Sequence, residues 1–197
     1  MRILFLGPPG AGKGTQAAKV AAELGIPHVS TGEMFRRHAT DGTEIGRRAQ
    51  AIMEAGDYVP DEVTIAMLEE RIAQPDARDG FILDGFPRTG AQAEALDASL
   101  GEHGLDRVVL FEVDEDEIVE RMLDRGRSDD TEEAIRTRLQ VYRDQTEPLV
   151  GIYDARRLLT RVDGMGQPHQ VTQRLLKVLG HVPPVGGRPV APGMAKD

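Results

Sequence analysis

The most constraining feature of this chain is a glycine-rich turn that directly follows a short apolar segment. The segment is Arg2-Ile3-Leu4-Phe5-Leu6, and the turn is Gly7-Pro8-Pro9-Gly10-Ala11-Gly12-Lys13-Gly14-Thr15. Glycines accept backbone conformations that residues with a Cβ avoid, so successive N–H groups can converge on phosphate oxygens at the start of the next helix. Lys13 adds a mobile charge for the outer phosphates. The pattern therefore predicts a strand, a phosphate-binding loop and a helix; a glycine-rich loop without a ligand is the less favoured alternative.

The spacing fits the glycine-x-x-x-x-glycine-lysine pattern of P-loops, with one departure. The usual pattern places a serine or threonine after the lysine, and that hydroxyl coordinates Mg²⁺. Here Gly14 follows Lys13, and the first hydroxyl comes at Thr15. We therefore expect Mg²⁺ to rest mainly on phosphate oxygens, water and a carboxylate elsewhere in the chain.

Composition narrows the class of protein. A chain of 197 residues fits one domain. Without cysteine it can form no disulfide and no cysteine-bound zinc site, and its five histidines lack metal-ligand spacing. The formal net charge of −9 argues against nucleic acid or an anionic membrane as the main partner. With no export segment or membrane span expected, the predicted location is the cytoplasm.

Apolar strands alternate with helical patterns along most of the chain. Strands are expected near 2–6, 28–29, 80–83, 107–113 and 161–162, and helices at 33–39, 43–55, 61–72, 88–100, 131–142 and up to about 179. Such alternation predicts an α/β fold with a parallel sheet covered by helices on both faces, whose ligands bind at the carboxyl ends of the strands. Residues 181–197 lack periodicity and are expected to form a disordered tail.

Charged residues stand at positions where phosphate chemistry would use them. Asp84 ends an apolar strand; a buried cap is the alternative, and a Mg²⁺ ligand acting through water is favoured. Arg121 and Arg125 lie one helical turn apart and can engage a single nucleotide. Because Asp129 and Asp130 stand among the arginines that follow, we expect a latch of ion pairs for which phosphate competes.

Four segments together resemble the adenylate kinase family. They are the phosphate loop, Val29 to Arg36, Gly80 to Arg88, and Arg121 to Arg138. The resemblance implies a P-loop core that catalyses ATP + AMP ⇌ 2 ADP with Mg²⁺, within a domain of residues 1–180. It also implies a nucleoside-monophosphate-binding insert at 30–59 and a lid at 124–130. Many bacterial relatives have a longer lid, some with a zinc-binding cysteine set; this short lid implies no zinc.

The same resemblance implies a role for individual residues. ATP would be bound by Gly10, Ala11, Gly12, Lys13, Gly14, Thr15, Arg121, Arg125 and Gly166. AMP would be bound by Thr31, Arg36, Asp57, Tyr58, Val59, Gly85, Phe86, Pro87, Arg88, Gln92, Arg127 and Arg138. Catalysis would fall to Lys13, Asp84, Arg88, Arg127 and Arg138.

Two alternatives remain open at this point. A kinase for UMP or CMP would share most of these motifs, although relatives of that kind tend to have alanine at the position of Thr31. A nucleotide-sensing module without transfer could use the same fold, but binding alone would not require so many converging cations. The expected partners are ATP, AMP and ADP, and the expected state is a monomer.

Overall fold

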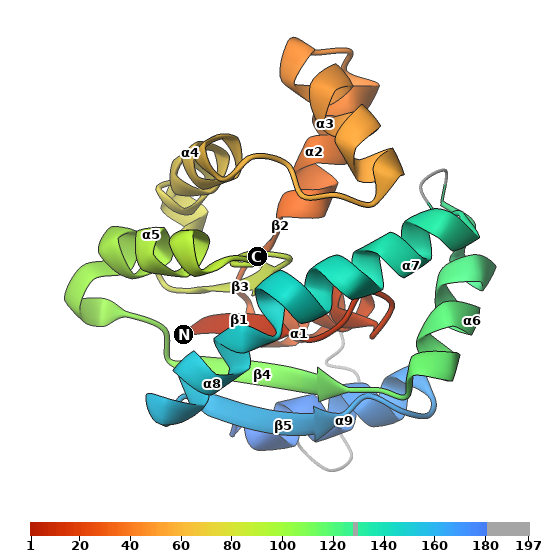
Figure 1. Cartoon of the computed structure of the whole chain (residues 1–197). Coiled ribbons are helices and arrows are strands. Elements are labelled where there is room, and N and C mark those ends of the chain that lie inside the picture. The colour runs from red at the N-terminus through yellow and green to blue at the C-terminus, as the bar shows by residue number, and fades with distance from the viewer. Residues whose placement is uncertain (128–129, 181–197) are drawn as a thin grey trace, which may run out of the picture.

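The computed structural model describes residues 1–127 and 130–180 and contains one parallel sheet. Its strands are β1 (Arg2–Leu6), β2 (His28–Ser30), β3 (Phe81–Asp84), β4 (Arg107–Glu112) and β5 (Leu159–Asp163). The order is β2-β3-β1-β4-β5, and all paired strands are parallel (Figure 1). From central β1 the chain forms β2 and β3 on one side and then β4 and β5 on the other, which places a crevice at the carboxyl end of β1.

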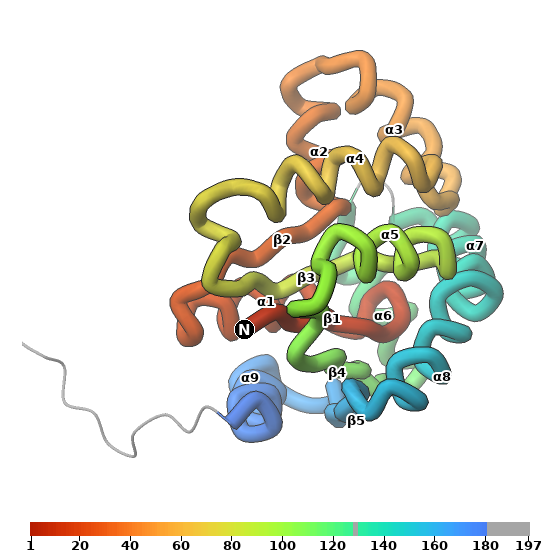
Figure 2. The backbone as a smooth tube through the Cα atoms, turned by 90° about the vertical axis from the view of Figure 1, so that its left-hand side faces the viewer, coloured from red at the N-terminus to blue at the C-terminus, as the bar shows by residue number. Residues whose placement is uncertain are grey.

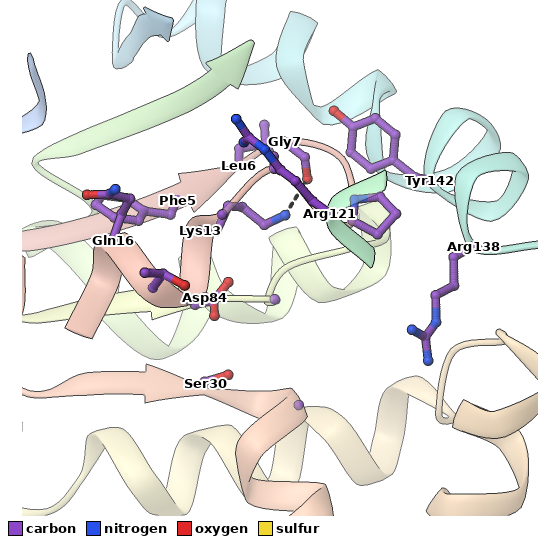
Figure 3. Close-up of a pocket in the computed structure, with 18 of the residues that line it drawn as sticks. Phe5, Leu6, Gly7, Lys13, Gln16, Ser30, Asp84, Arg121, Arg138 and Tyr142 are labelled. Carbon is purple, nitrogen blue, oxygen red and sulfur yellow. Dashed lines mark hydrogen bonds between the residues drawn. The ribbon is translucent and has the colours of Figure 1, made fainter. Parts of the chain in front are cut away.

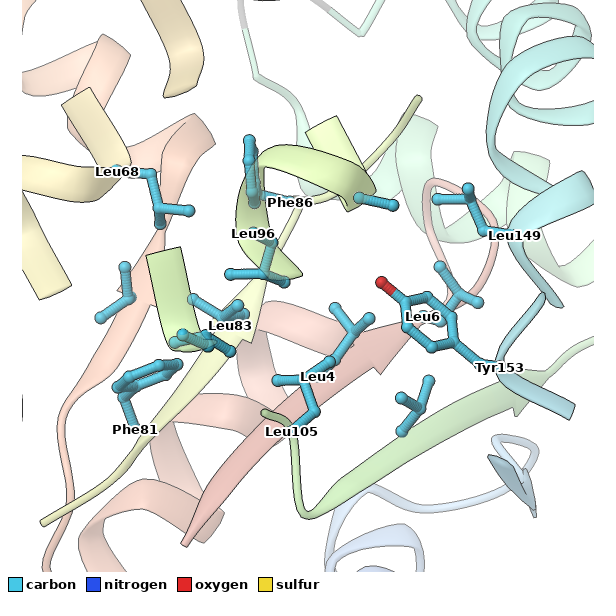
Figure 4. Close-up of a cluster of buried hydrophobic side chains, with 14 of the residues drawn as sticks. Leu4, Leu6, Leu68, Phe81, Leu83, Phe86, Leu96, Leu105, Leu149 and Tyr153 are labelled. Atoms are coloured by element: carbon cyan, nitrogen blue, oxygen red, sulfur yellow. The ribbon is translucent and has the colours of Figure 1, made fainter. Parts of the chain in front are cut away.

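Helices cover both faces of the sheet, as predicted. On one face, α1 (Lys13–Leu24) and α9 (Pro168–Val178) pack on the side chains of Ile3 and Phe5. On the other face, side chains of α4 (Asp61–Ile72), α5 (Gly90–Leu100) and α8 (Pro148–Ala155) meet Leu4 and Leu6 (Figure 4). Successive residues of a strand point to opposite faces, so apolar β1 joins both cores and holds the loop that follows it.

Two helices after β2 form a unit around a small core, against which Val63 and Met67 of α4 also pack. They are α2 (Thr31–Thr40) and α3 (Glu44–Ala55), which stand clear of the sheet in Figures 1 and 2. The core of this α2–α3 unit contains Phe35, Ala49 and Val59. Side chains of Ser30 and Thr43 cap the two helices by accepting bonds from the backbone N–H groups of residues 33 and 46.

A second helical pair lies on the opposite side of the sheet's carboxyl end. It consists of α6 (Glu115–Arg125) and α7 (Glu132–Val141), joined by apolar contacts between Ile118, Met122, Ile135 and Leu139. The helix predicted at 131–142 corresponds to α7, but the π-helix that continues the chain over Tyr142–Thr146 before α8 was not predicted. Short 3₁₀ turns at Pro75–Ala77 and Gly101–His103 complete the described structure.

Other sequence expectations need correction or lie outside the described residues. The helix expected from Arg88 begins at Gly90, because Thr89 caps it by accepting a hydrogen bond from the N–H of Gln92. The tail at 181–197 and positions 128–129 of the expected lid lie outside the described residues. No described helix has both the length and the apolar character needed to span a lipid bilayer.

Candidate active site

The glycine-rich loop connects β1 to α1 and packs closely against α6. A Cβ on Gly10 would lie 2.8 Å from Cγ of Met122 and 2.9 Å from Cγ2 of Ile118, so this close approach requires a glycine. Gly12 caps α1 with φ at 88°, in the left-handed region. The Nζ of Lys13 donates to the carbonyl oxygen of Gly7 at 2.7 Å (Figure 3) and to that of Pro8 at 2.7 Å. The lysine side chain is therefore bound by carbonyl groups of the loop itself.

A cavity of about 740 Å³ extends from this loop to the α2–α3 unit and to α7. It brings together most of the residues predicted for the site. On the loop side these are Gly10, Ala11, Gly12, Lys13, Gly14, Thr15, Arg121, Arg125 and Gly166. On the other side they are Arg36, Asp57, Tyr58, Asp84, Gly85, Pro87, Arg88, Arg127 and Arg138. Segments far apart in the sequence thus contribute cations to one space (Figure 3).

Four predicted residues are not part of the cavity wall. Thr31, Val59, Phe86 and Gln92 are all buried. Val59 packs in the core of the α2–α3 unit, and Phe86 belongs to the core beneath α5. The hydroxyl of Thr31 donates to the carbonyl oxygen of Gly85 at 2.9 Å. Their side chains therefore support the wall from behind.

Gln92 holds Arg88 in place through hydrogen bonds. Its Oε1 accepts from the N–H of Arg88 at 2.8 Å, and its Nε2 donates to Asp61 at 2.6 Å. Asp61 also accepts from the hydroxyl of Thr89 at 2.8 Å. Arg88 thus lies just before α5, and Gln92 reaches back to it from the first turn of that helix.

Lys13 carries its charge in a buried setting. The pKa of Lys13 is lowered to about 8, chiefly by burial; the Asp84 carboxylate opposes this shift, and the positive charges of Arg88 and Arg125 add to it. Protonated Lys13 is therefore costly in the free protein. An anionic phosphate beside it would favour the charged form.

Asp84, the last residue of β3, faces the start of α1. Burial alone would raise its pKa, but contacts with His28, Lys13 and Arg88 outweigh that effect and lower the pKa of Asp84. Its Oδ2 lies 3.2 Å from where a Cβ on residue 14 would stand, so Gly14 leaves room for this carboxylate. The arrangement keeps Asp84 ionised next to the position where the usual P-loop has its metal-binding hydroxyl.

His28 was given no role from the sequence, yet it touches Asp84. Its Nε2 lies 3.5 Å from Oδ2, and both side chains are largely buried. The local sequence around His28 carried no signal for this contact. It follows from β2 pairing with β3, which places Ser30 beside Asp84.

Asp130 lies between two cavity arginines. It pairs with Arg125 at 2.7 Å and with Arg138 at 2.9 Å, and these arginines lower the pKa of Asp130 against the effect of burial. Arg138 also donates to the carbonyl oxygen of Met53 in α3 at 3.0 Å. These contacts form the latch expected from the sequence; Asp129 lies outside the described residues.

A further group lines the loop side of the cavity without having been singled out from the sequence. It comprises Gln16, Gly164 and Pro168. The Nε2 of Gln16 donates to the carbonyl oxygen of Pro168 at 2.8 Å, which ties α1 to the start of α9 beside Gly166. Arg121 donates to the carbonyl oxygen of Gly164 at 3.2 Å. These contacts fix the far wall of the cavity.

Comparison with known proteins identifies the family. The family model described as "Adenylate kinase" matches residues 5–158. The chain belongs to the adenylate kinase family. It is 53% identical over 182 residues to an adenylate kinase of Nocardia farcinica, a match that covers 91% of this chain and 99% of the relative. An adenylate kinase of Thermobifida fusca is 54% identical over 185 residues, covering 91% and 98%, and one of Thermus thermophilus is 53% identical over 184 residues, covering 90% and 96%.

Membership in the adenylate kinase family identifies the reaction as phosphoryl transfer. Adenylate kinases are nucleotide-binding phosphotransferases that move the terminal phosphoryl group of ATP to AMP, and this chain is an enzyme of that family. The predicted family, α/β P-loop fold and activity are thereby confirmed. The two alternatives, a pyrimidine monophosphate kinase and a sensing module, lose their support.

Proposed function

We propose that this chain binds MgATP on the loop side of the cavity and AMP on the side of the α2–α3 unit, so that the phosphoryl group passes between them. The observation that carries the proposal is the continuity of the cavity. It has Lys13 and the loop amides on one side and Arg36, Arg88 and Arg138 on the other. Two nucleotides can then lie with their phosphates toward one another.

The donor side would bind the phosphates of ATP through backbone amides. Residues Gly10 to Thr15 turn into the start of α1, where the helix dipole favours an anion. Arg121 and Arg125 line the same side and would contact the nucleotide, with Gly166 against the adenine. Lys13 would exchange its bonds to Gly7 and Pro8 for the outer phosphates.

The acceptor side would bind AMP through Arg36 and Arg88 and the neighbouring wall. Asp57, Tyr58, Gly85 and Pro87 line this part of the cavity. Thr31, Val59, Phe86 and Gln92 would contribute by shaping that wall from behind, because they are buried. Gln92 would act chiefly by holding Arg88.

Transfer would depend on alignment and charge compensation. A migrating phosphoryl group spreads negative charge over its oxygens, and the protein supplies cations that meet that charge. Lys13, Arg88, Arg127 and Arg138 all line the cavity. The Asp130 carboxylate would leave Arg125 and Arg138 as phosphate takes its place.

Mg²⁺ would accompany ATP, with Asp84 as its partner through water. Within the described part of the chain no group of three or more carboxylate, histidine or cysteine side chains could hold a metal ion. Asp84 is ionised and lies beside Gly14, which fits a metal held mainly by phosphate oxygens and water. The bound metal would neutralise phosphate charge during transfer.

The insert at 30–59 and the lid at 124–130 would close over the two nucleotides. Support comes from the small core around which the α2–α3 unit is built and from the Asp130 latch. The closed site would exclude water from the phosphoryl group. We further propose that the enzyme acts as a cytoplasmic monomer on ATP, AMP and ADP.

The deciding experiment is an assay of ADP formation from ATP with AMP, UMP, CMP and GMP offered separately, with and without Mg²⁺. We expect AMP to be strongly preferred and activity to require Mg²⁺. Faster turnover of UMP or CMP would contradict the proposed acceptor. Activity that is unchanged by removal of Mg²⁺ would contradict the proposed role of the metal.

A further inference from the structure

Tyr58 connects the end of the α2–α3 unit to Arg88 by two separate contacts. The Cζ atom of Arg88 lies over the Tyr58 ring, 4.8 Å from its centre. The Tyr58 hydroxyl lies 2.9 Å from Oγ1 of Thr146, and that Oγ1 lies 2.8 Å from the carbonyl oxygen of Arg88. Both the side chain and the backbone of Arg88 are thus joined to Tyr58.

The direction of these hydrogen bonds is fixed by chemistry. A carbonyl oxygen can only accept, so the single hydroxyl hydrogen of Thr146 is donated to Arg88. The Tyr58 hydroxyl must therefore donate to Thr146. Thr146 is 4% exposed, so loss of either bond would leave a polar group poorly solvated.

The ring contact leaves Arg88 able to bind an anion. Its Nε already donates to the carbonyl oxygen of Gly85 at 2.7 Å. A cation attracted to the face of an aromatic ring uses no hydrogen-bond donor for that attraction. The ring therefore restricts the position of the guanidinium group while its remaining N–H groups can meet phosphate oxygens.

The two ends of the connection belong to different parts of the fold. Tyr58 is followed by Val59, which packs with Phe35 and Ala49 in the core of the α2–α3 unit. Thr146 ends the π-helix that leads into α8, which packs on the sheet. A displacement of the α2–α3 unit would therefore pull the ring away from Arg88.

We propose that Tyr58 is a positioning residue that couples the placement of the α2–α3 unit to the orientation of Arg88. The inference rests on the proposed function, because it takes Arg88 as the arginine that meets the acceptor phosphate. It goes further by giving the Tyr58 side chain a task other than contact with the nucleotide. Thr146 acts in the same connection by relaying the hydroxyl contact.

Three variants separate the two contacts. Tyr58→Phe keeps the ring and removes the hydroxyl, Thr146→Val removes the relay, and Tyr58→Leu removes both contacts of the tyrosine. We would measure kcat and KM for AMP and for ATP, together with thermal unfolding. Tyr58→Leu should lower kcat/KM for AMP by about 10-fold while the KM for ATP stays unchanged. Tyr58→Phe should recover most of that loss, and Thr146→Val should resemble Tyr58→Phe.

Tyr153→Phe is the matched control. The Tyr153 hydroxyl is buried and has no hydrogen-bond partner among the described residues, and its ring packs in the core beneath α5 and α8. This variant should leave both KM values and kcat unchanged. It tests whether loss of a tyrosine hydroxyl by itself alters the kinetics.

Two results would overturn the inference. One is a Tyr58→Leu enzyme whose kcat/KM for AMP stays within about twofold of the wild type. The other is a variant that loses stability and raises the KM for ATP as much as that for AMP, which would mark a merely structural role. Failure of the proposed function would instead appear in the wild type, as poor use of AMP, and would overturn both proposals.

Discussion

Arg125 and Asp130 form a two-pronged ion pair at the edge of the cavity, with Nε to Oδ2 at 2.8 Å and Nη2 to Oδ1 at 2.7 Å. The same carboxylate also accepts from Arg138 at 2.9 Å. Both arginines line the cavity in which phosphates would be bound. Asp130 therefore occupies, in the free protein, donors that a nucleotide would use.

Asp130→Asn should tighten ATP binding. The neutral amide competes less well with phosphate for the two guanidinium groups, so the Kd for ATP should fall by about threefold to tenfold. Titration calorimetry measures the change. Asp97→Asn is the matched control, because Asp97 pairs with Arg156 at 2.8 Å away from the cavity. Weaker ATP binding in Asp130→Asn would show that the carboxylate orients the arginines rather than competing for them.

Arg88→Ala and Arg138→Ala should each lower kcat by on the order of 10³, because each removes a cation that meets transition-state charge. Steady-state assays at saturating ATP and AMP measure the effect. Arg156→Ala, which removes an arginine from a surface ion pair, should leave kcat unchanged. Near-normal turnover in the Arg88 or Arg138 variant would refute the role assigned to that residue.

Gly14→Ala should weaken the binding of Mg²⁺ by disturbing the position of the Asp84 carboxylate. The added Cβ would lie 3.2 Å from Oδ2 of Asp84 and displace the carboxylate. The Mg²⁺ concentration for half-maximal activity should rise by about 10-fold, as for other changes to groups that orient a metal's ligands. Gly151→Ala, also in a helix and with open space around its Cβ, is the control. An unchanged Mg²⁺ dependence would count against the metal role of Asp84.

Lys13→Met should abolish transfer while the protein stays folded, as checked by activity and circular dichroism. The same variant tests the lowered pKa of Lys13. Because its pKa is about 8 when folded and 10.5 when unfolded, the folded state binds fewer protons between these values. The unfolding free energy of the wild type should therefore rise relative to that of Lys13→Met by about 2 kcal/mol from pH 8 to pH 10. A flat difference in urea titrations would contradict a buried, easily deprotonated lysine.

The sequence predicted the strands and the phosphate loop because these depend on local pattern. The apolar run of β1 and the glycines after it act through neighbouring residues, and Asp84 stands at the end of β3 as expected. The contact of His28 with Asp84 was not predictable, since it depends on strand order. The hydrogen bonds of Gln92 depend on the approach of α4 to α5, which no periodicity encodes.

The π-helix was missed for a similar reason. The helix predicted from the sequence ends at Tyr142, and nothing in the residues at 142–146 indicates a π-helix. In the structure Thr146 bonds to the carbonyl oxygen of Arg88 and to Tyr58, and these are tertiary contacts. Such contacts determine local geometry that propensity alone leaves undetermined.

The arrangement of two nucleotides in one cavity can be observed in a crystal structure with two adenosines joined by a phosphate chain. We expect one such molecule per chain, with phosphates on the amides of Gly10 to Thr15 and on the guanidinium groups of Arg36, Arg88 and Arg138. Arginines that point away from every phosphate oxygen in that complex would contradict the proposed mechanism.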